Sequence, residues 1–193
     1  GPKLDIYYSG WCDDCFNVWI PDRNAIHQLA GYVEINGEIK QKFDFKIQPH
    51  FNAVIDDKAL EVSGKTKAEV MAYPESKVVF GEFKRLLNQY ADPYNTKDKF
   101  FLCGYNNASF DNQFLRSFFK VNGDNYFGSW FWSNSLDVMV LSTQYLMSKR
   151  IEMPDFKLVS VAKAMGLDVD VTKAHDGLYD IELTYQIYKK IHE

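Results

Sequence analysis

A two-residue segment near the start of the chain constrains the fold more than any other. Asn36-Gly37 separates two strand-like segments, 25–35 and 38–49, and the second alternates, with apolar residues at Phe43, Phe45 and Ile47. Both residues tolerate positive φ, so the segment predicts a tight β-hairpin. A third β-prone and aromatic-rich segment, 4–12, precedes the hairpin. These three segments predict an antiparallel meander.

Helical and strand-like segments alternate after the meander. Apolar residues recur at helical spacing in 75–90, and an apolar strand at 99–103 leads into another helix. Asp176 is a plausible N-cap for the last helix. Further helices are expected at 57–62, 66–71, 138–147 and 158–165. This order predicts an α/β fold with a mixed sheet flanked by helices.

Composition places the chain among ordinary globular proteins. Hydrophobic residues make up 46% and charged residues 25% of its 193 residues, which is not typical of a disordered chain. We expect a single domain over 3–193 and interpret Gly1-Pro2 as a tag-cleavage scar. The net charge of −4 argues against a protein that wraps long duplex nucleic acid.

The sequence shows no membrane-spanning segment and no secretion signal. No apolar run is long enough to span a bilayer, and no signal peptide is visible. The three cysteines are an odd number without a repeating framework, which favours a reducing compartment. We therefore expect a cytoplasmic protein that has no membrane partner.

One candidate site residue follows the predicted strand at 99–103. Asp111 closes the segment Asn107-Ala-Ser-Phe-Asp111 and lies on the first turn of an otherwise apolar helix. Its carboxylate either supports the helix N-terminus, where the helix dipole favours negative charge, or takes part in chemistry. This segment alone does not decide between the two.

A second candidate pair lies at the start of the last helix. His175 and Asp180 are five residues apart, about 140° of rotation on an α-helix, so they cannot share a face of one regular helix. If His175 lies on the loop and Asp180 one turn into the helix, a mobile imidazole hangs over a fixed carboxylate. That arrangement suits a general base beside a metal. The alternative is a surface histidine near a helix-terminal acid.

Together the two segments resemble the DEDDh-type 3′–5′ exonucleases, a DnaQ-like family with an RNase H-like fold. In that family a carboxylate lies in an N-x-x-F-D segment, which Asp111 matches. A histidine precedes the last carboxylate by five residues, as His175 precedes Asp180. Ser63-Gly-Lys-Thr66 is similar to the family's H-G-I-T turn, with Ser63 in place of the histidine. The resemblance covers most of the chain.

The family's first motif, D-x-E at the end of the first strand, is damaged here. In one alignment Asp13 is the aspartate and Cys15 replaces the glutamate. In the other, Asp5 is the aspartate and Tyr7 replaces the glutamate. We favour the first alignment, because it leaves a full strand ahead of the acid. The glutamate is absent in both.

The resemblance implies a metal-dependent nuclease. Asp13, Asp111 and Asp180 would hold two Mg²⁺ or Mn²⁺ ions, and His175 would take the proton from the attacking water. The substrate would be the 3′ end of single-stranded nucleic acid, DNA rather than RNA, and the products nucleoside monophosphates. Because Mg²⁺ prefers oxygen ligands, a thiol replaces the lost glutamate poorly and the two-metal site is expected to be incomplete. A polymerase or another protein would be a partner.

Three other functions stay open. A protein with this fold and no glutamate could bind a single-stranded end or a protein partner without hydrolysis, although His175 favours chemistry. Trp11-Cys12-Asp-Asp-Cys15 is also similar to the W-C-x-x-C motif of thiol–disulfide redox proteins. Against this, Pro21 ends any following helix within two turns. A zinc site is the third, but one C-x-x-C supplies only two of its four ligands.

Overall fold

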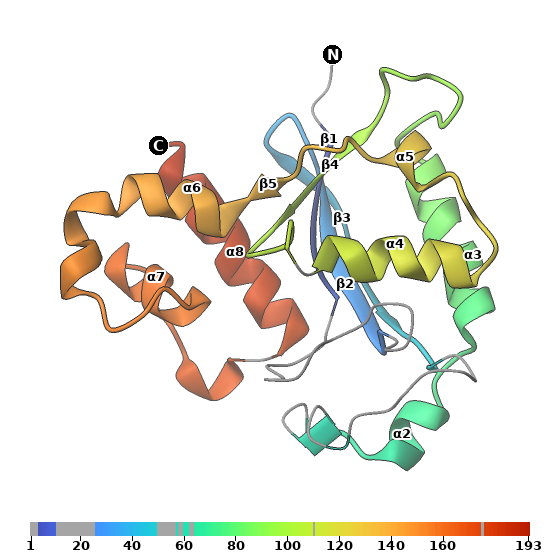
Figure 1. Cartoon of the computed structure of the whole chain (residues 1–193), viewed down its shortest axis with the longest axis horizontal. Helices are drawn as coiled ribbons and strands as arrows, with labels where there is room; N and C mark the ends of the chain where they lie inside the picture. The colour runs from blue at the N-terminus through green and yellow to red at the C-terminus, as the bar shows by residue number, and fades with distance from the viewer. Residues whose placement is uncertain are drawn as a thin grey trace.

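The centre of the molecule is a mixed sheet of five strands in the order β3-β2-β1-β4-β5 (Figure 1). The computed structural model of the chain describes residues 4–10, 26–49, 57, 60–61, 64–109, 111–174 and 176–193. The strands are β1 (Leu4–Gly10), β2 (Gln28–Ile35), β3 (Glu38–Lys46), β4 (Phe100–Gly104) and β5 (Leu136–Asp137). β1, β2 and β3 form the predicted antiparallel meander, while β4 is parallel to β1 and β5 is parallel to β4.

The hairpin between β2 and β3 follows its sequence signal closely. Asn36 and Gly37 have φ values of 53° and 83°, the left-handed conformations that a type I′ turn requires. The β2–β3 register shifts between Val33 and Glu34. Such an irregularity increases the local twist of the ribbon, and the meander can curve around the helices that pack on it.

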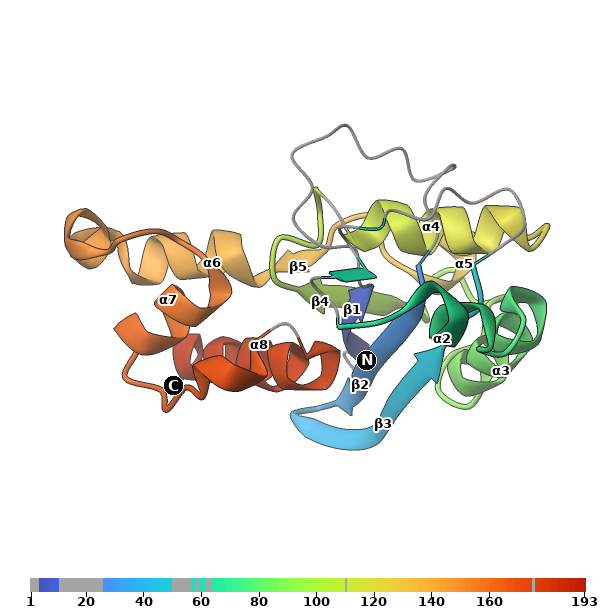
Figure 2. The ribbon, with the colours of Figure 1, turned by 90° about the horizontal axis from the view of Figure 1, so that it is seen from below.

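Helices cover both faces of the sheet (Figure 2). On one face lie α3 and α4 with the short α5, and on the other lie α6, α7 and α8. The helices are α2 (Lys67–Met71), α3 (Ser76–Asn88), α4 (Asp111–Val121), α5 (Phe127–Trp130), α6 (Val138–Tyr145), α7 (Leu158–Ala164) and α8 (Gly177–Ile191). Two 3₁₀ segments are η1 (Met147–Glu152) and η2 (Val171–Lys173). The predicted α/β class is confirmed.

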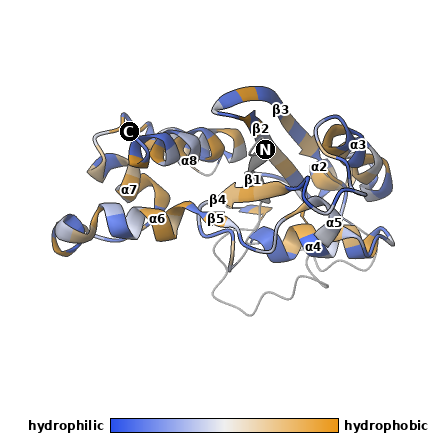
Figure 3. Cartoon of the chain, turned by 90° about the horizontal axis from the view of Figure 1, so that it is seen from above, coloured by the Kyte–Doolittle hydropathy of each residue, from blue (hydrophilic) through white to orange (hydrophobic). Residues whose placement is uncertain are grey.

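The alternation of side chains along β2 divides the core into two clusters. Leu29 and Val33 face the cluster beneath α3 and α4, whereas Ala30 and Tyr32 face the cluster beneath α8. In Figure 3 the strand β4 is mostly apolar in colour, and the helices mix apolar and polar residues, as expected for helices that lie on a sheet. The core therefore fixes both helical layers to the same strands.

Some expected elements differ from the observed ones. The helix expected at 138–147 ends as α6 at Tyr145 and continues as the 3₁₀ segment η1. β5 and α5 have two and four residues and were not predicted, because segments that short carry no periodicity. Of the helix expected at 57–62, residues 57, 60 and 61 are helical and the other three lie outside the described residues. No helix in the described ranges is long and apolar enough to cross a bilayer.

Candidate functional site

The predicted site elements meet at the edge of the sheet where β1 and β4 end. The two strands are parallel, with Tyr7 opposite Cys103, and they end at Gly10 and Gly104. β2 is antiparallel to β1, so its first residue, Gln28, lies at the same edge. Ligands of sheets with parallel strands bind at such an edge, outside the carboxyl ends of the strands.

Asp111 is the first residue of α4, as the sequence predicts. The backbone N–H of Asn112 donates to the carbonyl of Asn107 at 3.0 Å, which fixes the first turn against the preceding loop. The carboxyl group of Asp111 is buried, although the residue keeps some exposed surface. Burial raises its pKa well above the usual value, and the nearby carboxylate of Asp137 raises the pKa further. A neighbouring cation would favour the ionised form here.

Asp137 is a buried carboxylate that the sequence analysis missed. It ends β5, caps the N-terminus of α6 and is 7% exposed. Its Oδ1 accepts hydrogen bonds from the backbone N–H of Asn106 at 2.9 Å and of Met139 at 3.0 Å. The available sequence signal was an aspartate directly before the apolar segment that begins at Val138, which is an N-cap pattern.

Asp180 lies in the first turn of α8, as predicted. Asp176 is the N-cap of that helix, and its side chain accepts from the backbone N–H of Leu178 at 3.1 Å. The helix start lies against β2, because a Cβ added at Gly177 would lie 3.1 Å from Oε1 of Gln28. The first turn of α8 is thus placed at the edge of the sheet where β2 begins.

The first turns of α4 and α8 both lie beside β1. Each helix packs on that strand, and in Figure 1 both begin next to its lower half. They carry Asp111 and Asp180. The other predicted site residues, Asp13 and His175, lie outside the described residues, as do Cys12 and Cys15 of the redox hypothesis.

The extent of β1 bears on the two alignments of the first motif. Asp5 is the second residue of the strand and lies opposite Glu34 and Phe101. The strand runs on for five residues after Asp5, which is about 17 Å of extended chain. Asp13 follows the last residue of β1 by three positions in the sequence, and the choice between the two alignments stays a prediction.

The described residues contain carboxylates but do not form a complete metal site. No group of three or more His, Cys, Asp or Glu side chains in the described ranges is arranged to hold a metal ion. The buried carboxyl group of Asp111 is nevertheless a group whose ionised form a divalent cation would favour. Carboxylate oxygens are the ligands that Mg²⁺ prefers, so the residues present fit a divalent metal.

Two tyrosines near the site have their hydroxyl groups engaged. Tyr105 donates to the carbonyl of Phe156, and burial, with Asp137 and Asp155 nearby, raises its pKa. The hydroxyl of Tyr179 accepts a hydrogen bond from the backbone N–H of Asp170, the N-cap residue of η2, at 2.7 Å. Both hydroxyl groups therefore hold neighbouring segments of backbone in place.

Two lysines lie near the start of β2. His27 directly precedes the strand, and its pKa is lowered to about 4 by burial and by the charges of Lys46 and Lys65. Lys65 belongs to the turn that is similar to H-G-I-T, and Lys46 ends β3, where it also pairs with Asp44 at 3.5 Å. The neutral histidine thus has two cationic neighbours.

A family comparison identifies the class of protein. The family model described as RNase_T, Exonuclease, matches residues 15–188. The chain therefore belongs to this family of exonuclease domains, and the predicted family resemblance is confirmed. The match begins after β1, and so it does not include Asp5 or Asp13.

Solved structures of Escherichia coli Exonuclease I have the same fold. The complex with a dT13 oligonucleotide has a TM-score of 0.71 at 22% identity and covers 97% of this chain and 40% of that chain. A second structure of Exonuclease I, described as suggesting how processivity is achieved, has a TM-score of 0.68 at 22% identity. It covers 98% of this chain and 40% of that chain. The zinc-bound complex with ssDNA has a TM-score of 0.71 at 19% identity and also covers 98% of this chain and 40% of that chain. The predicted RNase H-like fold is confirmed, although the chain spans 40% of these relatives' length. No curated protein matches the chain significantly.

Proposed function

We propose that the chain is a metal-dependent 3′–5′ exonuclease domain that acts on single-stranded nucleic acid, DNA in preference to RNA. One observation carries the proposal: Asp111 and Asp180 lie in the first turns of two helices that pack on the same central strand. The chain also belongs to the exonuclease family. Its likeness in fold to Exonuclease I, which is solved in complex with ssDNA, supports DNA as the substrate.

The residues take the following roles. Asp13, Asp111 and Asp180 hold two Mg²⁺ or Mn²⁺ ions. When bound, such ions stabilise charge on the phosphoryl oxygens and on the leaving 3′-oxygen. His175, which precedes α8 in the sequence, accepts the proton of the attacking water as a general base. Cleavage of the 3′-terminal phosphodiester then releases a nucleoside monophosphate.

Local positive charge supports a nucleic-acid substrate in spite of the net charge of −4. Lys46 and Lys65 lie near His27, at the edge of the sheet where β2 begins. Cations near a strand end can hold the phosphate backbone of a short single-stranded segment. This arrangement fits binding at a nucleic-acid end rather than along a duplex.

A label-release assay tests the proposal. A single-stranded DNA oligonucleotide labelled at its 3′ nucleotide is incubated with Mg²⁺, Mn²⁺ or EDTA, beside a 5′-labelled copy. We expect the 3′ label to appear as mononucleotide at the earliest times with Mg²⁺ or Mn²⁺ and not with EDTA. Early release of the 5′ label as mononucleotide would contradict the direction of digestion.

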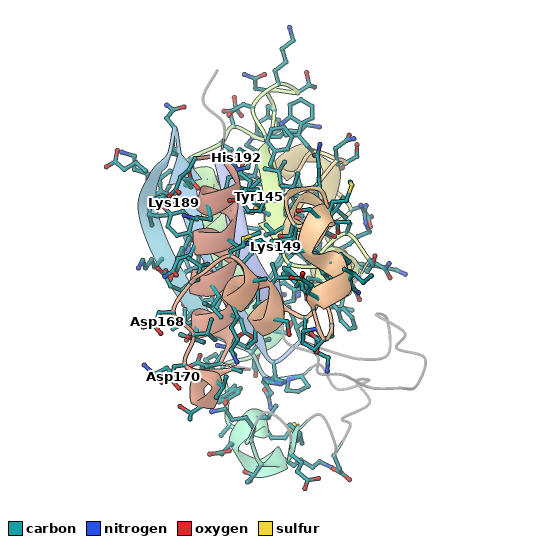
Figure 4. The ribbon with its side chains drawn as sticks, turned by 90° about the vertical axis from the view of Figure 1, so that its left-hand side faces the viewer. Tyr145, Lys149, Asp168, Asp170, Lys189 and His192 are labelled. Atoms are coloured by element: carbon teal, nitrogen blue, oxygen red, sulfur yellow. The ribbon has the colours of Figure 1, made fainter. Side chains whose placement is uncertain are left out.

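Asp180→Asn is the matching variant, because it removes the charge and keeps the shape of the side chain. We expect release to fall by at least about 100-fold, roughly 2.7 kcal/mol of transition-state stabilisation. The control is Asp168→Asn, which changes an exposed aspartate on the face shown in Figure 4 and should leave release unchanged. Equal activity of Asp180→Asn and the wild type would remove Asp180 from the site.

The second candidate function is binding without hydrolysis, which the missing first-motif glutamate favours in both alignments. Retention of the oligonucleotide with no release in Mn²⁺ would support it. The thiol–disulfide hypothesis depends on Cys12 and Cys15 and stays a prediction, as do a polymerase partner and a cytoplasmic location.

A further inference from the structure

We propose that Asp137 is a positioning residue of the site: its carboxylate holds the loop between β4 and α4 and thereby fixes the place of Asp111. The proposal rests on the proposed function, in which Asp111 holds a metal ion. It adds a residue that does not itself contact the metal or the substrate.

The loop that leads to Asp111 turns through a left-handed residue. Asn106 has a φ of 58°, a conformation that asparagine adopts more readily than most residues other than glycine. Its backbone N–H donates to Oδ1 of Asp137 at 2.9 Å, across 31 residues of sequence. Asp137 is 7% exposed, so water competes little for this hydrogen bond. The carboxylate therefore stabilises the turn at Asn106.

Asp137 has a second task that is distinct from this one. The same Oδ1 accepts from the backbone N–H of Met139 at 3.0 Å and so caps α6. Capping alone would account for the bond to Met139 but not for the bond to Asn106. The β4–β5 pairing sets Gly104 opposite Asp137, which brings the loop within reach of the carboxylate. One side chain thus joins the loop to the start of α6.

Asn107, the next residue, connects Asn106 to the first turn of α4 through hydrogen bonds. Asn107 is fully buried; its side chain donates to the carbonyl of Leu102 at 3.3 Å, and its own carbonyl accepts from the N–H of Asn112 at 3.0 Å. Asn112 directly follows Asp111. A displacement at Asn106 would therefore move the backbone that presents the Asp111 carboxylate.

Two variants separate the two tasks. Asp137→Ser keeps a good N-cap for α6, but its shorter side chain cannot also hold Asn106. Asp137→Asn keeps an oxygen acceptor for both N–H groups and loses the charge. The control, Asp170→Ala, removes an exposed N-cap aspartate of η2, on the face shown in Figure 4.

The measurements are amide hydrogen exchange at Asn106 without metal and the affinity for Mn²⁺ alone by titration calorimetry. We expect Asp137→Ser to lose protection at Asn106 and to bind Mn²⁺ at least about 10-fold more weakly, as is usual when a group that orients a metal ligand is lost. Asp137→Asn should keep the protection and bind Mn²⁺ within about 3-fold of wild type. Asp170→Ala should change neither quantity.

Several outcomes would overturn the proposal. The first is an Asp137→Ser variant in which the Asn106 amide is as protected as in the wild type. The second is an unchanged Mn²⁺ affinity in that variant. The third is an equal loss of Mn²⁺ affinity in Asp137→Asn, which would assign the effect to charge. If the wild type binds no Mn²⁺, the proposed function fails. The role of Asp137 is then decided by hydrogen exchange at Asn106 and by the backbone amide chemical shift of Asp111. Changes in both quantities in Asp137→Ser but not in Asp137→Asn support the role. The same values in Asp137→Ser and the wild type overturn it.

Discussion

Asp111 combines two conditions that oppose its ionisation. Its carboxyl group is buried, and Asp137 lies close to it, so its pKa in the folded chain is well above the ordinary value. The folded state therefore binds the proton more tightly than the unfolded state does. The stabilising contribution is fully present below the unfolded pKa, about 3.9 for aspartate, and is lost as pH rises through the raised folded pKa.

Replacing Asp111 with asparagine should therefore stabilise the metal-free protein at neutral pH. The amide is close in shape and cannot ionise, so the penalty for a buried charge disappears. Melting followed by circular dichroism in EDTA should give a higher Tm for Asp111→Asn than for wild type at pH 7, and the gap should close near pH 4. Each kcal/mol gained would raise Tm by about 2–4 °C for a domain of this size.

The exposed control Asp168→Asn should keep the wild-type pH dependence. A lower Tm for Asp111→Asn at pH 7 would show that the ionised carboxylate stabilises the fold. Mg²⁺ should raise the Tm of the wild type and leave that of Asp111→Asn almost unchanged, because ligand that binds only the folded state adds stability.

Single residues differ in how far the sequence reveals them. The sequence predicts Asp111 and Asp180 as site residues because each belongs to a short motif: Asp111 ends the segment 107–111, and Asp180 follows His175 by five residues. Asp137 was missed because its contact with Asn106 joins residues 31 apart, and no local spacing encodes that contact. The environment of the Asp111 carboxyl group was also beyond the sequence, since burial is a property of the packed chain.

The start of α8 depends on a close contact between two elements. Gly177 directly follows the N-cap residue, and a Cβ there would lie 3.1–3.2 Å from the side-chain amide of Gln28. Gln28 is held in turn, because its Nε2 donates to Asp44 at 2.9 Å. The helix can therefore sit on β2 only if the residue at position 177 is small.

Gly177→Ala should destabilise the protein by about 1 kcal/mol, although alanine is the better helix former, because the added methyl group must displace Gln28. Gln28→Ala in the same chain should remove the conflict, so that the two changes couple in a double-mutant cycle. Urea unfolding of the wild type, both single variants and the double variant measures the coupling. Additive effects, or a Gly177→Ala variant more stable than wild type, would exclude the contact as a constraint.

Whole elements follow their local signals when those signals are strong. The hairpin at Asn36-Gly37 and the N-cap at Asp176 lie where turn and capping chemistry predict them. β2 and β3 are shorter than expected, beginning at Gln28 and ending at Lys46, since alternation does not show where pairing stops. β5 depends on pairing with β4 rather than on its own two residues, so only tertiary structure reveals it.

At the scale of the whole molecule, the chain has the fold of the family, while the sequence predicts an altered first motif. The fold follows that of Exonuclease I over 97% of the chain at 22% identity. The family match begins only at residue 15, after β1 and at the position where the first alignment replaces the glutamate. The sheet and both helical layers are thus present, and restoring the charge of the predicted missing glutamate tests what its loss does.

Cys15→Glu should raise nuclease activity. With Asp13 it recreates D-x-E beyond the end of β1, which runs through Gly10. A bridging carboxylate added to a site short of negative charge should hold the metal pair better. We expect a gain of at least about 10-fold in release of the 3′ nucleotide, equivalent to about 1.4 kcal/mol.

Tyr7→Glu is the matched control for the other alignment, in which Asp5 is the motif aspartate. Asp5 lies opposite Phe101, five residues before β1 ends, so a glutamate at position 7 should not restore the site. Activity gained with Tyr7→Glu but not with Cys15→Glu would reverse the assignment of the first motif. His175→Ala placed in the Cys15→Glu chain should abolish the gain, because the added metal charge still needs a base for the attacking water. If Cys15→Glu, Tyr7→Glu and the wild type all release nothing in Mn²⁺ yet retain the oligonucleotide, the domain binds nucleic acid without cutting it.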